Sequence, residues 1–564
     1  MKRKKLAVYM LTLLFILAAV VIEKKELAKR DFPFSVTVTV DGYEKKISCV
    51  DLGGAYYVFL PSYAEQGAAT FCTNPVYDIY IGDQLLTDGM NCGLFPLDSA
   101  LNLFYGKNDG EPDATVTFVG SGNVGTVYID VRSGDMTYIH KKKGNEEGGH
   151  IQVYGADGRL WHQGDLQSIR GRGNVTWSWD KKPYSITLRN PANLLDMGEA
   201  EEWILLANAA EPTQLRNKIA YDLAAEVGLP YSPESRWVDL YLNGEYAGLY
   251  LLTERNEIHP QRVAANSKSF LVSMELEHRL QSQNYPYIRT GCGTVLRIHQ
   301  SGVSNQSLRQ IWESAENAIF AEDGVDPLTG KSWTELIDLD SWAQKYLLEE
   351  LMGNYDAASV SQYFYYDDDT GKIFAGPVWD MDNSLGYDQW TSASNAILAG
   401  REHLWSDEDA PLFYALLEKE DFLKRVVELY GDIYRPALNK LCRTGLKTYM
   451  THLSVAQKMN WTRWPELAWE TDPETIISYI KSRMAFMDAY LPNKSDYITV
   501  HAWKPYYIWS CWAILPGETV EPLPEEEGYW YDMETGERFE FGTPIYENII
   551  LRQMSMEEAE EWFG

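Results

Sequence analysis

The segment NYDAASVSQYFYYDDDTGKIFAGPVWDMDNSLG, residues 354–386, holds the most informative pattern in the chain. Two aromatic and apolar runs flank a polar turn at residues 369–371, and this arrangement predicts a β-hairpin. Asp356 precedes the hairpin, and Asp380 and Asp382 follow it. The segment therefore predicts acidic side chains at both ends of one hairpin.

Asp380 and Asp382 pose an electrostatic problem. They come directly after a run that predicts a buried strand, and their spacing of two residues places both on the same side. Like charges this close repel each other, and burial of either is costly unless a cation lies between them. A solvated turn, favoured by Asn383, and a divalent-metal site, favoured by the apolar Trp379, are the two explanations. We interpret the pair as metal ligands.

The sequence around this segment predicts a mixed α+β organisation. Residues 338–356 have the apolar period of an amphipathic helix that ends near Gly353. Farther upstream, residues 212–230 predict another helix, and residues 236–254 predict a hairpin with an Asn-Gly turn.

Two further stretches complete the pattern of the central region. Strands are expected over residues 149–174 and 181–190. Beyond Arg255 the pattern is mostly helical, with several helices over residues 410–490. The central region thus begins with strands and ends with helices.

The chain is long enough for several domains. A length of 564 residues predicts about three or four of them. Residues 33–122 alternate apolar and polar positions between turn residues, which predicts a β-rich accessory domain without evident chemistry. Residues 125–490 form the central domain, and the aromatic, β-like residues 497–554 form a small third one.

The N-terminal residues 1–30 predict export. They hold a basic start, an apolar run from Leu6 to Ile22 and a second charged stretch. A helix over this run is about 25 Å long, at the short end for spanning a bilayer. An uncleaved anchor and a signal peptide are the alternatives, and we favour the anchor because no small-residue cleavage site follows. The N-terminus then stays cytoplasmic and the remainder is exported, anchored to the cell membrane by one span or secreted to the cell surface.

Composition excludes some functions. The formal net charge of −31 argues against sequence-independent binding of nucleic acid, which depends on lysine and arginine contacts to phosphate. The six cysteines are scattered and form no pattern with zinc spacing. A hydrophobic content of 45% is ample for packed cores.

The order of predicted elements over residues 125–490 matches that of protein kinases. A glycine-rich turn, a strand that begins at a lysine pair, a helix, two strands, a helical region, an acid, a hairpin and a second acid follow one another in both. Order alone is weak evidence, because one fold serves many functions. The acids at the corresponding junctions strengthen it.

Residues 125–490 resemble the CotH (spore coat protein H) kinase family of atypical, secreted kinases. The resemblance rests on three blocks in the same order: IRGRGNVTWSWDKKPYSITL, WILLANAAEPTQLRNKIAYDLAAEVGLPYSPESRWVDLYLNGEYAGLYLLTE and the segment 354–386. It implies an atypical two-lobe domain of the protein-kinase type, with ATP and Mg²⁺ or Mn²⁺ as cofactors. Several long blocks make the resemblance more specific than any single motif.

The resemblance implies roles for the three acids. Asp356 is expected to accept or orient the proton of the attacking hydroxyl group, although an acid after a helix is by itself often only solvated. Asp380 and Asp382 are expected to hold the metal ion on the ATP phosphates. Asp380 is our choice of primary ligand by its spacing from Asp356.

The resemblance also implies nucleotide contacts, each with a plainer alternative. A kinase needs a lysine on the α- and β-phosphates, and we prefer Lys182 to Lys181, although such a pair at the start of a strand is often solvated. The glycine-rich turn can bind phosphate through N–H groups or be an ordinary hairpin turn. The other expected contacts are Arg170 and Arg172 of this turn, Arg216 and Asn217 of the predicted helix or merely of its surface, and Arg255 and Asn256 at the hinge, through their backbone.

One position departs from ordinary kinases. These place an Asn five residues after the catalytic Asp to hold a second metal ion. Here that position is Ser361, followed by Gln362, and neither is a good substitute. Either Asp382 takes this role, or only one metal ion binds tightly.

Residues 497–554 resemble the Listeria-Bacteroides (internalin B-type) repeat, a small β-grasp-like surface module. The matching pieces are WYDMETGERFEF and TPIYENIIL. The residues usual between the Gly-Tyr and Trp-Tyr pairs are missing, so we expect shortened first strands. The resemblance covers only part of this region.

These observations predict an extracytoplasmic, membrane-anchored kinase that transfers the γ-phosphoryl group of ATP to a Ser or Thr hydroxyl of a surface or coat protein. A first alternative is a surface binding or assembly protein with little or no turnover, which the anchor and the terminal modules would suit. A second alternative is a metal-dependent glycosyltransferase or hydrolase of cell-wall sugars, favoured by the 19 Trp and 37 Tyr residues. The adjacent positions of Asp380 and Asp382 fit metal binding better than the separated carboxylates of a glycosidase.

Overall fold

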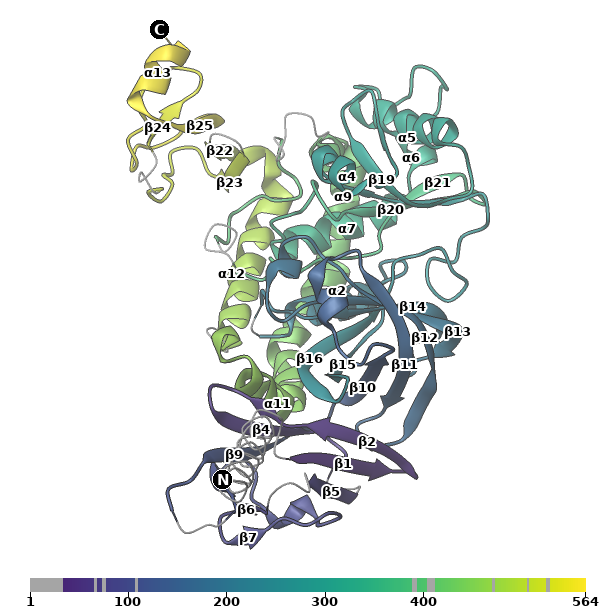
Figure 1. The fold of residues 1–564 in the computed structure, drawn as a ribbon. Coiled ribbons are helices and arrows are strands. Elements are labelled where there is room, and N and C mark those ends of the chain that lie inside the picture. Colours follow the sequence, from purple (N-terminus) through teal and green to yellow (C-terminus); the bar gives the residue numbers. More distant parts are fainter. Residues whose placement is uncertain are drawn as a thin grey trace, which may run out of the picture. The chain divides into compact units, whose positions relative to one another are not determined.

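The computed structural model describes residues 34–563, except residues 65–67, 74–77, 107–109, 212, 388–392, 403–410, 469–471, 505–506 and 524–527. Figure 1 labels its helices and strands. Its internal contacts divide the chain into two compact units. The first unit takes the described residues of Met1–Ala209, Arg236–Thr253 and Met450–Trp469. The second takes those of Ala210–Ser235, Glu254–Tyr449 and Glu470–Gly564.

Two sheets form the N-terminal part of the first unit. One has the strand order β2-β1-β5 and the other β3-β4-β9-β8-β6-β7. Their elements are β1 (Phe34–Val40), β2 (Tyr43–Ser48), β3 (Val50–Asp51), β4 (Ala55–Leu60), β5 (Ala68–Thr73), β6 (Ile79–Ile81), β7 (Gln84–Leu85), the short 3-10 helix η1 (Cys92–Leu94), β8 (Leu101–Tyr105) and β9 (Ala114–Gly120). The described residues of this region have the β-rich character that the sequence predicts. Its extent as a separate domain, residues 33–122, stays a prediction.

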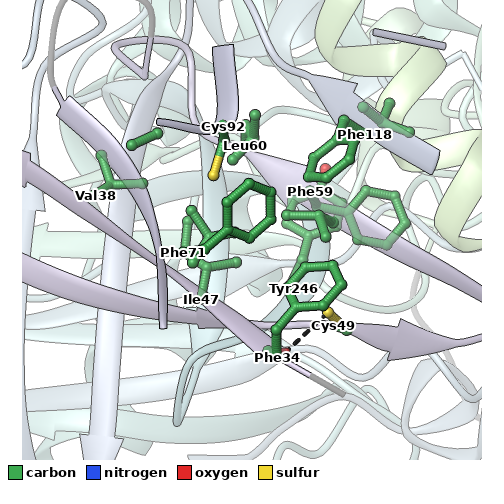
Figure 2. Packing of buried hydrophobic residues seen from close by; sticks show 14 of the residues in the cluster. Phe34, Val38, Ile47, Cys49, Phe59, Leu60, Phe71, Cys92, Phe118 and Tyr246 are labelled. Carbon is green, nitrogen blue, oxygen red and sulfur yellow. Dashed lines mark hydrogen bonds between the residues drawn. The ribbon is translucent and has the colours of Figure 1, made fainter. Parts of the chain in front are cut away.

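Aromatic side chains fill the core under these sheets (Figure 2). The ring centroid of Phe71 lies 5.1 Å from that of Phe34 and 5.9 Å from that of Phe118, both in edge-on geometry. Phe59 packs at 4.9 Å against Tyr246, which comes from a much later strand. Because this core includes residues from both parts, the N-terminal sheets and the strands that follow belong to one unit.

Most of the rest of the first unit is a closed barrel with the strand order β10-β11-β12-β13-β14-β16-β15. A parallel pairing of β10 with β15 closes it. Asn243 and Gly244, with φ of 50° and 83°, form the predicted hairpin turn between its last two strands, which is confirmed. The elements are β10 (Gly125–Val131), α2 (Thr137–Lys141), β11 (Glu146–Tyr154), β12 (Leu160–Gly171), η2 (Val175–Ser178), β13 (Tyr184–Asn193), β14 (Glu199–Leu206), β15 (Ser235–Leu242) and β16 (Glu245–Glu254).

The second unit contains a five-stranded sheet with the order β18-β19-β17-β20-β21. Its strands are β17 (Phe270–Met274), β18 (Tyr287–Arg289), β19 (Val295–Ser301), β20 (Tyr363–Asp367) and β21 (Lys372–Ala375). The predicted hairpin at residues 363–375 is confirmed. The prediction of a mostly helical region beyond Arg255 is wrong for the first three strands, because runs this short do not reveal their period.

Helices make up most of the remaining second unit, as expected for residues 410–490. Helix α7 begins where Asp338 accepts a hydrogen bond from the Ser341 N–H, and it ends at Gly353, whose φ is 63°. The predicted end of this helix is confirmed. The helices that lie outside the barrel region are α3 (Arg216–Glu226), between β14 and β15 in the sequence, and, after β16, α4 (Glu277–Gln283), α5 (Asn305–Phe320), α6 (Trp333–Leu336), α7 (Leu339–Met352), α8 (Leu412–Leu417), α9 (Glu420–Leu429), η3 (Tyr430–Tyr434), α10 (Arg435–Lys440), η4 (Leu441–Gly445), α11 (Leu446–Arg463), η5 (Pro465–Leu467), α12 (Glu474–Tyr490) and η6 (Leu491–Asp496). Of these, η5 and the residues of α11 from Met450 onward belong to the first unit.

A four-stranded sheet follows α12 in the second unit. Its order is β23-β22-β25-β24, with the first and last strands along the chain parallel and adjacent at its centre. The elements are β22 (Ile498–Lys504), β23 (Tyr507–Ile514), β24 (Tyr529–Asp532), β25 (Ile549–Met554) and α13 (Met556–Phe563). The mixed α+β class is thus confirmed, whereas the two-lobe division and the β-grasp-like repeat stay predictions.

The predicted anchor or signal segment, residues 1–30, lies outside the described residues. Within the described part of the chain, every helix is too short or too polar to cross a bilayer.

Candidate active site

Asp356 lies in the loop after α7, and buried side chains hold the backbone of this loop. Asn354 is fully buried, and its Oδ1 accepts a hydrogen bond from the Asp356 N–H at 3.2 Å. Its Nδ2 donates to Glu349 Oε2 at 2.6 Å. The Asp356 backbone is therefore fixed to the last turn of α7.

Glu349 is itself one partner of a buried ion pair. Lys345 Nζ lies 2.6 Å from Glu349 Oε1, one helical turn away, and neither side chain is exposed. Burial of two charges costs several kcal/mol per ion before their attraction is counted. Because the same carboxylate accepts the hydrogen bond from Asn354, this costly pair is connected to the Asp356 loop.

The half-buried Asp356 side chain lies among charged groups. Burial is the largest cause that raises the pKa of this carboxyl group to about 7, followed by the nearby charge of Asp380. The positive charges of Arg279 and Arg401 lower this pKa, and Glu275 raises it. Asp356 therefore changes its protonation state near neutral pH.

Asp380 contacts the loop that carries Asp356. Its Oδ2 accepts a hydrogen bond from Ser361 Oγ at 2.8 Å, and its side chain is exposed. The backbone of Asp380 is left-handed, with φ of 63°. Strand β21 has already ended at Ala375. The prediction that Asp380 and Asp382 share one side of a strand end is therefore wrong.

Backbone hydrogen bonds join the two acid-bearing segments. The Tyr355 N–H donates to the Asn383 carbonyl at 3.2 Å, and the Leu385 N–H donates to the Met352 carbonyl at 2.6 Å. Two of these partners, Met352 and Tyr355, precede Asp356, and the other two, Asn383 and Leu385, follow Asp382. Residues far apart in the chain are thus held together at the end of α7.

Asp382 is held by helix α3. Asn217 Nδ2 donates to Asp382 Oδ1, and Asn217 Oδ1 accepts from the Met381 N–H at 2.9 Å. Met381 is buried, whereas Asp382 is half-buried. The amide of Asn217 therefore orients the segment between the two aspartates, with Ser361 as the partner of one and Asn217 as the partner of the other.

Arg216, the neighbour of Asn217, is also buried against this segment. Its Nε donates to the Ser384 carbonyl at 2.8 Å, and its Nη1 lies 3.4 Å from Glu211 Oε2. Burial raises the pKa of Glu211 to about 7, although the charge of Arg216 opposes this effect. Arg216 and Asn217 are thus positioning groups for the aspartate segment rather than helix-surface residues.

Arg255 and Asn256 follow β16, where the sequence places the hinge. The Arg255 carbonyl accepts a hydrogen bond from Arg262 Nη1 at 3.4 Å. Asn256 is buried. Arg262 Nε also lies 3.6 Å from Glu254 Oε1, and Arg262 Nη1 forms an ion pair with Glu257. Ion pairs within this stretch therefore hold its backbone in place. Whether its backbone receives adenine stays a prediction.

Lys181 and Lys182 of the first unit both have backbone carbonyls as partners. Lys181 is buried in the barrel, where its Nζ donates to the carbonyls of Ala207 at 2.7 Å and Leu249 at 2.6 Å. Lys182 is half-buried, and its Nζ donates to the carbonyls of Trp177 and Trp179 at 3.0 Å each. In this structure Lys182 thus holds the loop after the glycine-rich turn.

Arg170 and Arg172 lie at the start of that loop. Arg170 is exposed at the end of β12, and Arg172 is half-buried. Lys143 contacts the same turn, with Nζ 2.8 Å from the Gly173 carbonyl. The sequence analysis did not single out Lys143, because nothing in the sequence connects it to a turn thirty residues later.

Comparison with family models matches residues 169–487, more than half of the chain, to the family described as CotH kinase protein. The chain belongs to the CotH kinase family. Among solved structures, the crystal structure of the Helicobacter pylori proinflammatory kinase CtkA matches at 13% identity and a TM-score of 0.25, covering 54% of this chain and 95% of that one. A TM-score this low carries no argument about the arrangement of elements. No curated protein matches.

The structure also brings two buried charged residues to this site that the sequence does not indicate. Glu349 and Arg401 are buried charged residues on either side of the Asp356 loop. Charged residues in an amphipathic helix predict an exposed face, so the sequence does not indicate that Glu349 is buried. Arg401 is distant in the chain, and only the fold brings it to this loop.

A divalent metal ion of the kind that the CotH kinase assignment implies fits the two aspartates. Among the residues that the structure describes, no three His, Cys, Asp or Glu side chains come together to hold a metal by themselves. Mg²⁺ needs fewer, because it usually takes one or two carboxylates and completes its shell with water and substrate phosphates. Asp380 is exposed, and its contact with Ser361 engages only Oδ2.

Proposed function

We propose that this chain is an extracytoplasmic, metal-dependent kinase that transfers the γ-phosphoryl group of ATP to a Ser or Thr hydroxyl of a surface or coat protein. The observation that carries this proposal is the pairing of the Asp356 loop with the segment of Asp380 and Asp382. The two segments that carry the three acids singled out by the family's motifs are hydrogen-bonded to each other at the end of α7. A protein that only binds or assembles has no physical need for this arrangement.

Asp356 acts as the base in this proposal. It accepts the proton of the attacking hydroxyl group, and its pKa of about 7 lets it do so near neutral pH. Asn354 holds its backbone, and Ser361, farther along the same loop, binds Asp380. The position of the proton acceptor is thus linked through one loop to that of the metal-binding Asp380.

Asp380 and Asp382 hold Mg²⁺ or Mn²⁺ in this proposal, with Asp380 as the primary ligand. The bound ion would neutralise negative charge on the ATP phosphates as the γ-phosphoryl group leaves. Ser361 and Asn217 each orient one of the two carboxylates. Either Asp382 serves a second ion, or a single ion suffices.

The nucleotide contacts proposed for Lys182, Arg170, Arg172, Arg255 and Asn256 rest on the family's motifs. For Lys182 the proposal requires a change of partner, because its ammonium group now binds two loop carbonyls. The same holds for Lys181, whose partners are two barrel carbonyls. Of the two, Lys182 needs the smaller change because it is half-buried rather than buried.

Export and anchoring by residues 1–30 belong to the proposal, as do the two-lobe division and the surface role of residues 497–554. The central parallel pair β22 and β25 supports a β-grasp-like module, since this fold places its first and last strands side by side. Such a module suits a protein at the cell surface.

Binding of nucleotides distinguishes this function from its rivals. We expect the purified chain to bind ATP in the presence of Mg²⁺ or Mn²⁺ and to lose this binding when the metal is chelated. A titration with a nucleotide sugar under the same conditions is the control. Binding of the nucleotide sugar but not of ATP would favour the sugar-transfer alternative, and binding of neither would favour a surface-binding protein.

The buried contacts of Glu349 with Lys345 and with Asn354 can be tested with two matched double variants. Lys345→Met with Glu349→Gln removes both charges but leaves an oxygen that accepts from Asn354. Lys345→Met with Glu349→Leu removes the acceptor as well. We expect the first variant to keep its transfer rate within a few-fold and the second to lose about tenfold to a hundredfold in kcat, because an unsatisfied buried amide releases the loop.

Steady-state kinetics with ATP checks this expectation, and KM for ATP should change little in both variants. Replacement of a buried ion pair by packed neutral groups is often neutral for folding, so the first variant should unfold close to the wild type. The second should be less stable by about 1–3 kcal/mol, the usual cost of an unsatisfied buried amide. Equal kcat values for the two variants would show that the Asn354 contact does not position Asp356.

A further inference from the structure

Residues 393–402 form a segment that buried charges hold in place; we call it the Arg401 segment. The Glu350 carboxylate accepts hydrogen bonds from three successive N–H groups, those of Leu398, Ala399 and Gly400, at 2.9 Å each. Arg483 of α12 donates to the same carboxylate and to the Ala396 carbonyl, both at 2.5 Å. The backbone of the segment is thus clamped between α7 and α12.

The Arg401 segment also pairs with the edge of the C-terminal sheet. The Ile397 N–H donates to the Cys511 carbonyl at 2.8 Å, and the Ala513 N–H donates to the Asn395 carbonyl at 3.0 Å. An antiparallel bridge joins Ala396 to Trp512, which lies between these two β23 residues. Since β23 is an edge strand of its sheet, residues 395–397 cover that edge like an added strand.

The end of this segment lies against the Asp356 loop. The Arg401 side chain is 1% exposed, and its Nη2 lies 3.2 Å from the Ala357 carbonyl and 3.4 Å from Ser359 Oγ. These two residues lie one and three positions after Asp356. Burial of an arginine charge is costly without partners. The position of Arg401 therefore depends on the contacts with Glu350 and Arg483 and on the pairing with β23, which hold the segment in place.

We propose that the C-terminal sheet is part of the catalytic machinery: by pairing with residues 395–397, strand β23 holds Arg401 on the loop that carries Asp356. Arg401 is then a positioning residue, and the edge of β23 controls how firmly it is held. This inference rests on the proposed function for its effect on catalysis. It gives residues 498–514 a role beyond the family match, which ends at residue 487.

A single substitution can break the pairing and leave the sheet intact. Ala513→Pro removes the N–H that donates to Asn395. This N–H points away from β22, because opposite residues in an antiparallel pair exchange hydrogen bonds only at every second position. Proline is tolerated at such positions of edge strands. Ile397→Pro breaks the same pairing from the other side and serves as the second variant.

The expected result in the full chain is a loss of about tenfold in kcat for Ala513→Pro, with little change in KM for ATP. Arg401→Met should lose at least as much. If the sheet acts through Arg401, the double variant that combines Ala513→Pro with Arg401→Met should have the same kcat as Arg401→Met alone. Tyr546→Ala, at a side chain 72% exposed on the same module, is the matched control and should leave kcat unchanged.

Hydrogen exchange gives a readout that does not require activity. Ala513→Pro and Ile397→Pro should both speed exchange of the amides at residues 356–361, whereas Tyr546→Ala should not. Unchanged exchange and kcat in both proline variants would overturn the inference, as would losses that multiply in the double variant. If the wild-type chain transfers no phosphate, the proposed function fails, and the exchange data still decide the inference.

Discussion

Asp356→Asn is expected to reduce phosphoryl transfer by about 10²- to 10⁴-fold, the usual contribution of a general base. The amide keeps the shape of the side chain but cannot take the proton of the acceptor hydroxyl group. Binding of ATP with metal should stay close to that of the wild type, because Asp380 and Asp382 are unchanged. Single-turnover transfer and equilibrium titration of ATP measure the two quantities separately.

The same variant should be more stable, which excludes unfolding as the cause of lost activity. The pKa of Asp356 is raised to about 7 from 3.8, so the folded state disfavours its charged form. The resulting loss in the free energy of unfolding is absent below the unfolded-state pKa of 3.8, grows between about pH 4 and 7, and is complete above about pH 7. Asn carries no charge, so at pH 8 Asp356→Asn should unfold at a higher temperature than the wild type. Retained transfer would remove Asp356 from the mechanism.

Asp380→Asn and Asp382→Asn are expected to have the second-largest effect. Each removes one negative charge and keeps an oxygen for the Ser361 or Asn217 contact. We expect transfer to fall about 10²-fold or more in each, because loss of a metal ligand removes several kcal/mol of charge stabilisation. Metal-dependent binding of ATP should also weaken, more for Asp380→Asn if Asp380 is the primary ligand. Metal titrations at fixed ATP measure this difference.

Asp369→Asn is the matched control for these two variants. Asp369 lies in the exposed turn between β20 and β21, so it carries the same charge on the hairpin that precedes the two aspartates. Transfer and metal dependence should be unchanged there. If Asp380→Asn and Asp382→Asn behave like this control, the pair lies in a solvated turn and does not bind a metal ion.

The sequence predicts well those elements that local chemistry specifies. Gly353 ends α7 because a left-handed residue is needed there, and the Asn243-Gly244 turn supplies two adjacent residues with positive φ. Strands β17 to β19 were missed because each is short and pairs with partners far away in the sequence. Nothing local reveals a strand whose stability comes from its neighbours.

The candidate site follows the same division. The acids 356, 380 and 382 can be identified in the sequence because their residue types and the elements around them match a known chemistry. Glu349 cannot, since a charged position in an amphipathic helix predicts exposure, whereas the structure buries it with Lys345. The partners of Lys181 and Lys182 are backbone carbonyls, which carry no sequence signal at all.

Transfer of labelled γ-phosphate from ATP by the purified full-length chain, with Mg²⁺ or Mn²⁺ and with Asp380→Ala as control, tests the central claim most directly. The predicted result is label on a Ser or Thr of the chain itself or of an added surface protein, absent in the Asp380→Ala variant. Label that persists in this variant, or no label together with no metal-dependent ATP binding by the wild type, would contradict the assignment of a kinase active site to the end of α7.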